Sequence, residues 1–371
     1  MRVKLSDVTK YAKGTQINRD DLIENGQYIY LNGGINPSGR WNDANVKGNT
    51  VTISEGGNSS GYVNYMTEPF WCGAHCYYLF DGPKNTRYLY YALKSQQERL
   101  FSIRSGACMP NIKKADLGKF EFEFDRDERK QNKIVTVLSK IEAVIGERKR
   151  ELELLDELVK SRFVEMFGDP ISNPLGWLED DMKGICTKIT DGEHGSVARS
   201  DSGHAFLNAK HIKKDGTIDW KTVTYTNDEI HNKIYARCNP EPGDILLTTT
   251  GTIGNVAIVP DVAPFSMDRG ITLLKLRSDK VKNTFVATLL GSKGIQDVMS
   301  SNVHASAIGH LFLNKVMKIP VIVPPLELQE RFSAFVAQTD KSKLIIQKNL
   351  DELETLNKAL MQKYFGGNEV R

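Results

Sequence analysis

Three side chains that could bind a metal ion lie close together in the sequence: Cys72, His75 and Cys76. Thiolates and imidazoles are typical zinc ligands, but a structural zinc site needs a second pair of ligands at a matching spacing, and no such pair follows. The chain has 5 cysteines, an odd number at scattered positions, which is not a disulfide framework. We therefore predict buried, reduced thiols and no metal site.

Two other patterns could indicate catalysis on nucleic acid. Residues 239–242 read Asn-Pro-Glu-Pro, which lacks the consecutive prolines and the aromatic ring with which an Asn-Pro-Pro-aromatic methylase motif stacks a flipped base. Asp244, Asp261 and Asp268 could bind metal in a nuclease, but scattered acidic residues are ordinary on a protein surface. No phosphate-binding loop of the form Gly-x4-Gly-Lys-Ser/Thr is present. The sequence thus predicts no catalytic residues and no cofactor bound by this chain.

The composition sets the broad class of protein. The 371 residues are 40% hydrophobic and 26% charged, which is typical of a soluble protein of two or three domains. No apolar run approaches the roughly 18 residues of a membrane span, and the N-terminus lacks the apolar segment of a signal peptide, so we expect a cytoplasmic protein. The net charge of +3 does not by itself indicate a nucleic-acid partner.

A long-period internal repeat is the most informative feature of the sequence. The segment from Gln131 to Gly168 realigns without gaps on the segment from Gln329 to Gly366, at a constant offset of 198 residues. Both segments lack proline and end at a glycine, as a helix does. We therefore predict two long helices at equivalent places in two halves of the chain.

Both predicted helices carry an apolar seam whose positions alternate in steps of three and four, which is the heptad pattern of a coiled coil. The apolar seam positions predicted to form the interface are Ile134, Leu138, Ile141, Ile145, Leu152 and Leu155 in the first helix, and Phe332, Val336, Ile346, Leu350, Leu353 and Leu360 in the second. Polar residues at the seam positions Arg148, Lys343 and Asn357 would fix register. Each helix could instead pack only on its own domain, but two matched seams favour an antiparallel coiled coil.

A domain-sized segment precedes each helix, and the two segments share one order of elements. Each has a strand followed by a Gly-rich loop, then a short helix, then a small-residue loop and a last strand. The predicted strands span 49–54 and 120–124 in the first segment and 244–248 and 319–323 in the second, and the short helices span 88–93 and 283–299. We predict an α+β protein with two similar α/β domains separated by the paired helices, related by a pseudo-two-fold. The predicted domains are 1–126 and 169–326, and the helical spacers are 127–168 and 327–367.

Over almost its whole length the sequence resembles the specificity subunits of type I restriction–modification systems. The resemblance rests on an ordered set of short stretches together with the two-helix repeat. These stretches are 29–39, 61–63, 70–76 and 109–112 in the first half, and Thr190 to His194, Phe167 to Pro170 and Pro324 to Gln329 around the second. Asp125 to Glu128 replaces the double proline that usually precedes the first helix.

The resemblance implies a function and a set of partners. Each globular domain would be a target-recognition domain that binds one half of a bipartite site in double-stranded DNA, and the helices would set the gap between the halves. Two methyltransferase (modification) subunits and motor–nuclease (restriction) subunits would assemble on the chain. Adenine methylation and cleavage, with S-adenosylmethionine, ATP and Mg²⁺, would belong to those partners, so the chain itself would not be an enzyme.

Side chains that recognise bases must offer donors or acceptors to the groove edges, as Arg and Lys do to guanine and Asn and Gln do to adenine. The DNA-binding candidates in the first half are Lys13, Gln16, Asn32, Asn36, Arg40, Ser59 and Asn111. Those in the second half are His194, Arg199, Asn208, Lys210, Thr250, Arg269, His304 and His310. Each could equally be a solvated loop residue.

Two other functions remain open from the sequence. The chain could be a stand-alone DNA-modifying enzyme or nuclease with an unrecognised motif, in which case the purified chain alone would change DNA covalently. It could also be a coiled-coil scaffold that joins two proteins and binds no DNA.

Overall fold

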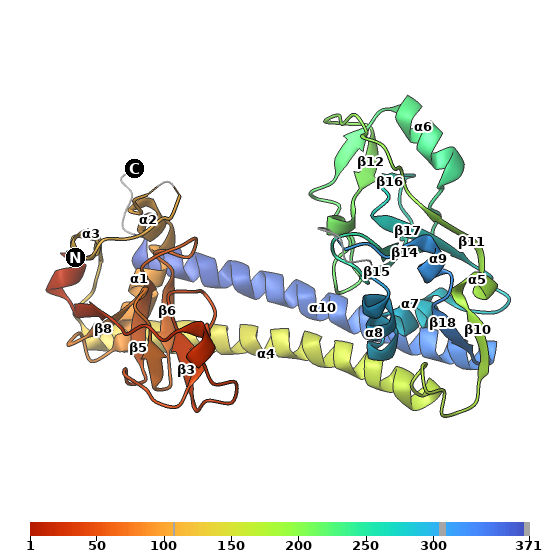
Figure 1. Ribbon diagram of the computed structural model, residues 1–371. Coiled ribbons are helices and arrows are strands. Elements are labelled where there is room, and N and C mark those ends of the chain that lie inside the picture. Colours follow the sequence, from red (N-terminus) through yellow and green to blue (C-terminus); the bar gives the residue numbers. More distant parts are fainter. Residues whose placement is uncertain (107, 304–308, 367–371) are drawn as a thin grey trace. The chain divides into compact units, whose positions relative to one another are not determined.

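The computed structural model describes residues 1–106, 108–303 and 309–366 of the chain. The contacts within the chain define two units, Met1–Lys149 with Gln347–Arg371, and Arg150–Ile346 (Figure 1). The long helices α4 (Glu128–Phe167) and α10 (Leu326–Phe365) contribute one half each to both units. Each unit is therefore one globular domain together with a pair of half-helices.

The globular domain of the first unit consists of short strands and short helices. These are β1 (Arg2–Lys4), η1 (Leu5–Asp7), β2 (Lys10–Lys13), η2 (Arg19–Asp21), β3 (Tyr28–Leu31), β4 (Gly39–Trp41), β5 (Thr50–Ser54), β6 (Val63–Met66), β7 (Phe70–Cys72), β8 (Cys76–Phe80), α1 (Thr86–Lys94), α2 (Gln97–Ser102), α3 (Lys114–Gly118) and β9 (Glu121–Glu123).

The globular domain of the second unit follows α4 in the chain. Its elements are β10 (Leu178–Asp181), α5 (Met182–Ile185), β11 (Cys186–Asp191), β12 (His204–Leu207), η3 (Ala209–His211), β13 (Thr224–Thr226), α6 (Asp228–Arg237), β14 (Ile245–Thr248), β15 (Val256–Ile258), β16 (Ser266–Met267), β17 (Ile271–Leu276), α7 (Asn283–Gly291), α8 (Lys293–Ser301), α9 (Leu313–Val316) and β18 (Pro320–Val323).

The two domains share one sheet topology, strand for strand. In the first, a four-stranded sheet has the order β2-β8-β5-β6, and in the second the order is β11-β17-β14-β15. The three-stranded sheets β4-β3-β7 and β13-β12-β16 also correspond, each with one parallel and one antiparallel pairing. The pairs β1-β9 and β10-β18 complete the match. Helix α6 interrupts the equivalence, because the connection from β4 to β5 contains no helix.

The mixed α/β architecture with two similar domains and two long helices confirms the predicted fold class. One predicted element is wrong: the helix expected over 283–299 is two helices, α7 and α8, separated by Ser292. The backbone of Ser292 is extended (φ −68°, ψ 148°), and its hydroxyl donates to the carbonyl of Leu289 at 2.7 Å. This local hydrogen bond competes with the helical one, so the helix ends and restarts.

Each domain packs its four-stranded sheet and its helices around one core that includes part of both long helices. In the first unit, Val51 and Ile53 of β5 share a core with Leu138 of α4 and Phe365 of α10. Four rings form the corresponding cluster in the second unit, with centroid distances between 4.9 and 5.6 Å among the contacting pairs: Phe163, Phe167, Phe285 and Phe332. Burial of this apolar surface fixes each domain on its helix pair.

Both long helices carry an equivalent buried glutamine in the first turn, Gln131 in α4 and Gln329 in α10, which the sequence repeat aligns. The side chain of Gln131 donates to the carbonyl of Asp125 at 2.6 Å, and that of Gln329 donates to the carbonyl of Pro324 at 2.8 Å. The carboxylate of Asp127 accepts from the backbone N–H of Arg129 at 2.9 Å and caps the first helix. An aspartate therefore supplies the helix start where a double proline was expected.

The long helices pack against each other in an antiparallel arrangement within each unit. In the second unit, the last turn of α4 meets the second turn of α10, where the rings of Phe167 and Phe332 lie 5.5 Å apart. An ion pair crosses between the helices in each unit, Lys343 to Asp156 at 2.6 Å and Lys149 to Glu354 at 2.9 Å. The predicted pairing of the two helices is thus confirmed.

The twelve apolar seam residues are all buried or half-buried, whereas leucines one or two positions off the seam face solvent. Leu350 on the seam is 5% exposed, and Leu356 off the seam is 47% exposed. The seam lysine and asparagine are also partly buried: Lys343 is engaged by Asp156, and the Asn357 side-chain oxygen has no hydrogen-bond partner. The heptad pattern therefore describes which helix faces meet.

Candidate nucleic-acid interface

Some of the polar candidates lie at one end of the four-stranded sheet in each domain, and the backbone hydrogen bonds make the two ends equivalent. The N–H of Glu55 donates to the carbonyl of His75, and the N–H of Thr249 donates to the carbonyl of Gly270, both at 2.8 Å. The backbone carbonyls of Glu55 and Thr249 also have equivalent partners. The N–H of Ile112 donates to the carbonyl of Glu55, and the N–H of Leu311 donates to the carbonyl of Thr249, both at 2.9 Å. Equivalent backbone positions at this end of the two sheets therefore carry different side chains.

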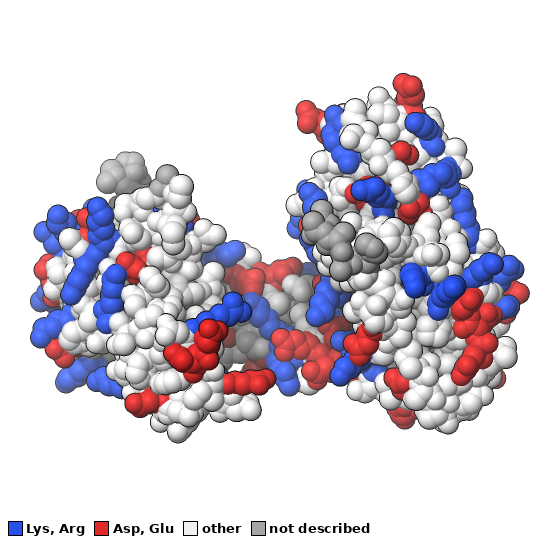
Figure 2. All heavy atoms as spheres, in the orientation of Figure 1, with Lys and Arg blue, Asp and Glu red and all other residues white. Residues whose placement is uncertain are grey.

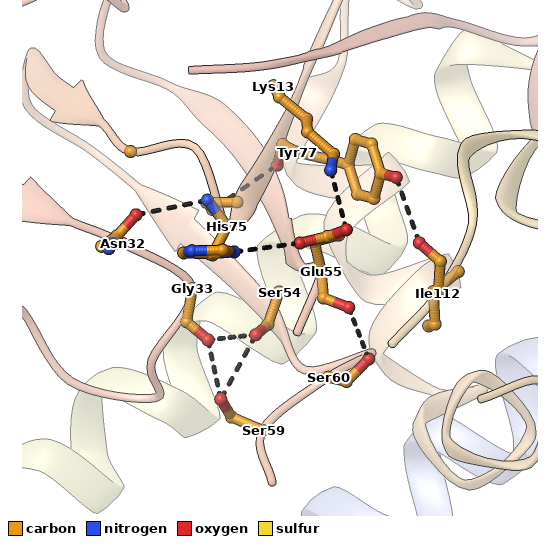
Figure 3. Close-up of polar contacts among 12 residues, drawn as sticks. Lys13, Asn32, Gly33, Ser54, Glu55, Ser59, Ser60, His75, Tyr77 and Ile112 are labelled. Atoms are coloured by element: carbon orange, nitrogen blue, oxygen red, sulfur yellow. Dashed lines mark hydrogen bonds and ion pairs between the residues drawn. The ribbon is translucent and has the colours of Figure 1, made fainter. Parts of the chain in front are cut away.

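In the first domain a carboxylate, a lysine and a histidine form a cluster at this end of the sheet (Figure 3). The Nζ of Lys13 lies 2.7 Å from one oxygen of Glu55, and the Nδ1 of His75 lies 3.2 Å from the other. Burial alone would raise the pKa of Glu55, but the hydrogen bonds from Lys13 and His75 outweigh it and hold this pKa below its ordinary value. Glu55 is therefore a carboxylate at neutral pH.

The loops around this cluster are held by hydrogen bonds to the backbone. The side-chain oxygen of Asn32 accepts from the N–H of His75 at 3.2 Å, and the hydroxyl of Ser60 donates to the carbonyl of Glu55 at 2.7 Å (Figure 3). The hydroxyl of Ser59 donates to the carbonyl of Gly33 at 2.7 Å. The predicted candidates Asn32 and Ser59 thus position the loops that carry Glu55 and His75.

The second domain has a different polar cluster at the equivalent end. Asp191, the last residue of β11, is paired with His194 at 2.8 Å and with Arg237 at 3.3 Å. Beside it, the hydroxyl of Thr250 lies 2.6 Å from the Nδ1 of His310. A cavity of about 780 Å³ opens here, and its lining includes Asp191, His194, Thr250, Arg269 and His310.

The four predicted candidates His194, Thr250, Arg269 and His310 therefore lie together around one cavity, although they are far apart in the sequence. Burial, followed by the positive charge of Arg269, lowers the pKa of His310. The imidazole of His310 is consequently neutral at pH 7 and can accept or donate one hydrogen bond.

Several other candidates have side chains that are already engaged by their own domain. The guanidinium of Arg40 donates to the carbonyls of Gly26 and Gln27 at 2.6 and 3.0 Å. The guanidinium of Arg199 lies over the ring of Phe206, 3.6 Å from its centroid. These two arginines therefore have contacts that hold loops in place.

The remaining polar candidates include both exposed and half-buried side chains. Gln16, Asn36 and Lys210 are exposed, whereas Asn111 and Asn208 are half-buried. The hydroxyl of Ser105 donates to the side chain of Asn111 at 3.0 Å, and the side chain of Asn208 is hydrogen-bonded to Asp268. Asn208 follows β12 as Asn32 follows β3, so the two asparagines are structural counterparts. His304 lies outside the described residues.

Four members of these clusters were not predicted as DNA contacts: Glu55, His75, Asp191 and Arg237. Glu55 and Asp191 stand where a strand ends, a position that the sequence pattern identifies, but their cationic partners are brought to them only by the fold. Arg237 ends α6, the helix without a counterpart in the first domain. His75 was considered only as a metal ligand beside Cys72 and Cys76.

The two thiols beside His75 are buried within the protein. Cys72 and Cys76 are 0% and 1% exposed. The hydrogen bond with Cys76, together with burial, raises the pKa of the Cys72 thiol and disfavours the thiolate that a metal would require. Of the residues with a described placement, no three His, Cys, Asp or Glu side chains are grouped so that they could hold a metal ion.

Basic and acidic side chains both lie on the face of the molecule that Figure 2 draws. Figure 2 shows Lys and Arg side chains interspersed with Asp and Glu on each unit, without one continuous basic area among the described residues on this face. Within the described ranges, no helix is long and apolar enough to cross a bilayer.

Sequence comparison assigns the chain to a known family. The family model described as the type I restriction modification DNA specificity domain matches residues 1–155 and 190–355. The chain belongs to this family of type I restriction–modification specificity subunits, which recognise DNA sequence. The function predicted from the ordered motifs and the helix repeat is thereby confirmed.

Individual relatives cover most of the chain. A Mycoplasma genitalium protein assigned as a type I specificity subunit is 27% identical over 363 residues, covering 95% of this chain and 90% of that protein. The Methanocaldococcus jannaschii type I restriction enzyme MjaVIII specificity subunit is 22% identical over 297 residues, covering 76% of this chain and 69% of that protein.

Solved structures share the fold. The crystal structure of a type I restriction–modification S subunit from M. genitalium has a TM-score of 0.61 at 22% identity, covering 98% of this chain and 96% of that one. A chain from a structural study of complex assembly in a type I system has a TM-score of 0.53 at 15% identity, covering 98% of this chain and 96% of that one.

Proposed function

We propose that each globular domain recognises one half of a bipartite site in double-stranded DNA. The observation that carries this proposal is the strand-for-strand match between the two domains, combined with different side chains at the same sheet end. Lys13 and Glu55 stand where Asp191 and Thr249 stand in the other domain. Two domains with the same sheet topology but different polar side chains at this end are suited to recognising two different DNA sequences.

The proposed contacts with DNA come from both loop clusters. Those in the first domain are Lys13, Gln16, Asn32, Asn36, Arg40, Ser59 and Asn111, and those in the second are His194, Arg199, Asn208, Lys210, Thr250, Arg269, His304 and His310. The contacts already made by Arg40 and Arg199 favour an indirect role for these two, whereas the exposed Arg269 suits phosphate or guanine acceptors. Lys13 is also exposed, but its Nζ is paired with Glu55.

The proposed protein partners are two methyltransferase subunits and motor–nuclease subunits, which would carry S-adenosylmethionine, ATP and Mg²⁺. Apolar side chains on the long helices, outside the seam, support a docking role. The more exposed of these are Leu154, Leu158 and Val164 on α4, and Leu344, Ile345 and Leu356 on α10. Leu158 and Leu356 are equivalent in the sequence repeat, so each helix offers a similar contact. We place the complex in the cytoplasm, with the DNA.

Exchange of one domain tests independent recognition. Replacing residues 1–126 with the equivalent domain of a relative should change one half of the methylated site and leave the other half intact. Sequencing the methylated sites in cells that express the hybrid with its methyltransferase measures both halves at once. The exchange of 169–326 is the matched control and should change the other half. Coordinated changes in both halves after either exchange would rule out independent domains.

A further inference from the structure

Both domains place a carboxylate, a histidine and a cation at the same end of the same sheet. In the first domain, Glu55 is paired with Lys13 and His75. In the second, Asp191 is paired with Arg237 and His194. The two carboxylate side chains have nearly the same exposure, 14% and 13%, while both histidines are 60% exposed.

The two clusters are assembled from different elements. Glu55 follows β5, but its counterpart in the second domain is Thr249, whose hydroxyl is buried against Thr272 at 3.3 Å. Asp191 ends β11 and occupies the place of Lys13, which ends β2. Its cation, Arg237, comes from α6, which has no counterpart. The same combination of a carboxylate, a cation and a histidine thus comes from non-equivalent positions in the two domains. The shared sheet topology alone therefore does not explain why both domains have it.

A carboxylate can contact DNA under two conditions. First, neighbouring cations must offset its repulsion by the phosphates; second, it must accept a hydrogen bond from a donor on the DNA. Each carboxylate here has a cation and a histidine that orient it, which meets the first condition. An ionised carboxylate has about four acceptor sites, and the two partners use about two of them. The donor that a base edge offers in the major groove is an exocyclic amino group, and an acidic side chain is the typical acceptor for the N4 amino group of cytosine.

We propose that Glu55 and Asp191 are specificity-determining residues, each of which accepts a hydrogen bond from an exocyclic base amino group in the half-site bound by its own domain. The cytosine N4 group fits best, and the adenine N6 group offers the same chemistry. Lys13, His75, His194 and Arg237 position the carboxylates. This proposal rests on the proposed function, because it requires each domain to bind one half-site.

The experiment uses the specificity subunit assembled with its methyltransferase subunits and a library of duplexes with randomised half-sites. Sequencing the methylated duplexes gives the base preference at each position. Glu55→Gln and Asp191→Asn keep the size of each side chain but replace a pure acceptor with an amide. We expect each to lower the preference at one base pair by about tenfold or more, in its own half-site only. The identity of that pair, C·G or A·T, distinguishes the two amino groups.

The opposite ends of the same sheets supply control ion pairs, whose carboxylates are more exposed than Glu55 and Asp191. Lys10 pairs with Asp81 at 3.0 Å, and Lys275 pairs with Glu241 at 2.8 Å. Asp81→Asn and Glu241→Gln should leave every position of the site unchanged. Each experimental variant also serves as a control for the other, because the half-sites should respond separately.

Different outcomes separate failure of this inference from failure of the proposed function. A uniform loss of methylation over all sequences, or unchanged base preference, would overturn the role of the two carboxylates. If the wild-type complex showed no half-site preference, the proposed function itself would fail. Where a neutral variant does not fold, Glu55→Asp and Asp191→Glu keep the charge and move it by one methylene, and unchanged preference in these variants overturns the inference equally.

Discussion

His231 illustrates how burial sets the state of a single residue in the second domain. Its ring stacks on His204 at a centroid distance of 3.7 Å, and its Nδ1 lies 2.9 Å from the hydroxyl of Ser266. Burial, followed by the repulsion of His204, lowers the pKa of His231, while Asp228 partly opposes the shift. The native state therefore favours the neutral ring.

This lowered pKa predicts a pH-dependent stability. The unfolded chain binds a proton to His231 near pH 6.5, and the folded chain binds it only at a lower pH, so the unfolded state gains protons first as the pH falls. The contribution of His231 is present above about pH 6.5 and is lost as the pH falls through its folded pKa, with a limiting slope of about 1.4 kcal/mol per pH unit.

Urea unfolding between pH 7.5 and 5 measures this slope. A His231→Gln variant should show a shallower loss of unfolding free energy than the wild type, although His211 and His310, whose pKa values are also lowered, still contribute. Equal slopes for both proteins would contradict the assignment.

The residues of the candidate interface were predictable only in part. Thr250 and His310 were predicted separately from residue type, but their contact at 2.6 Å depends on two loops brought together by the fold. Glu55 was missed because its partners, Lys13 and His75, lie 42 and 20 residues away. Strand ends that meet through sheet pairing cannot be matched from one sequence without the register.

At the level of elements, the helix seam was predictable because helical periodicity is a local property of the sequence. The pattern separates Leu350, which is buried in the seam, from Leu356, which lies on the same helix and is largely exposed. The break at Ser292 was not predictable in the same way. Its flanking glycines weaken the helix, and the local hydrogen bond to Leu289 accompanies the extended backbone of Ser292.

Two substitutions on α10 test the seam. Leu350→Asp buries a charge without a partner and should lower the free energy of unfolding by about 3 kcal/mol or more. Leu356→Asp makes the same chemical change on the exposed face and should change it by about 0.5 kcal/mol. Chemical denaturation of the purified chains gives both values. Similar losses in the two variants would show that the seam is not the packed face.

On the scale of the whole molecule, α4 and α10 each pass from one unit into the other without a break in the helix. At 1.5 Å per residue, a helix of 40 residues is about 60 Å long. Since each domain is fixed to its own half of the helix pair by a shared core, we infer that helix length governs the gap between the two half-sites. The net charge of +3 does not indicate where DNA would bind.

Lengthening both helices tests this inference directly. Seven residues inserted after Lys149 and seven after Ile346, where the chain passes between units, keep the heptad phase and add about 10.5 Å. That length matches about three base pairs at roughly 3.4 Å each. The helix ends rotate by only about 20°, whereas three base pairs turn the DNA by roughly 100°, so full activity on a longer site is not expected.

The measurable outcome is therefore the preferred gap, and the bases of the half-sites serve as the internal control. A library in which only the gap varies, methylated by the lengthened complex, should show a shifted gap preference with the same bases in both halves. Insertion of four residues adds about 6 Å but breaks the seam phase, so it should reduce stability as well as change the gap. An unchanged gap preference after both in-phase insertions would refute the role of helix length, even with DNA binding intact.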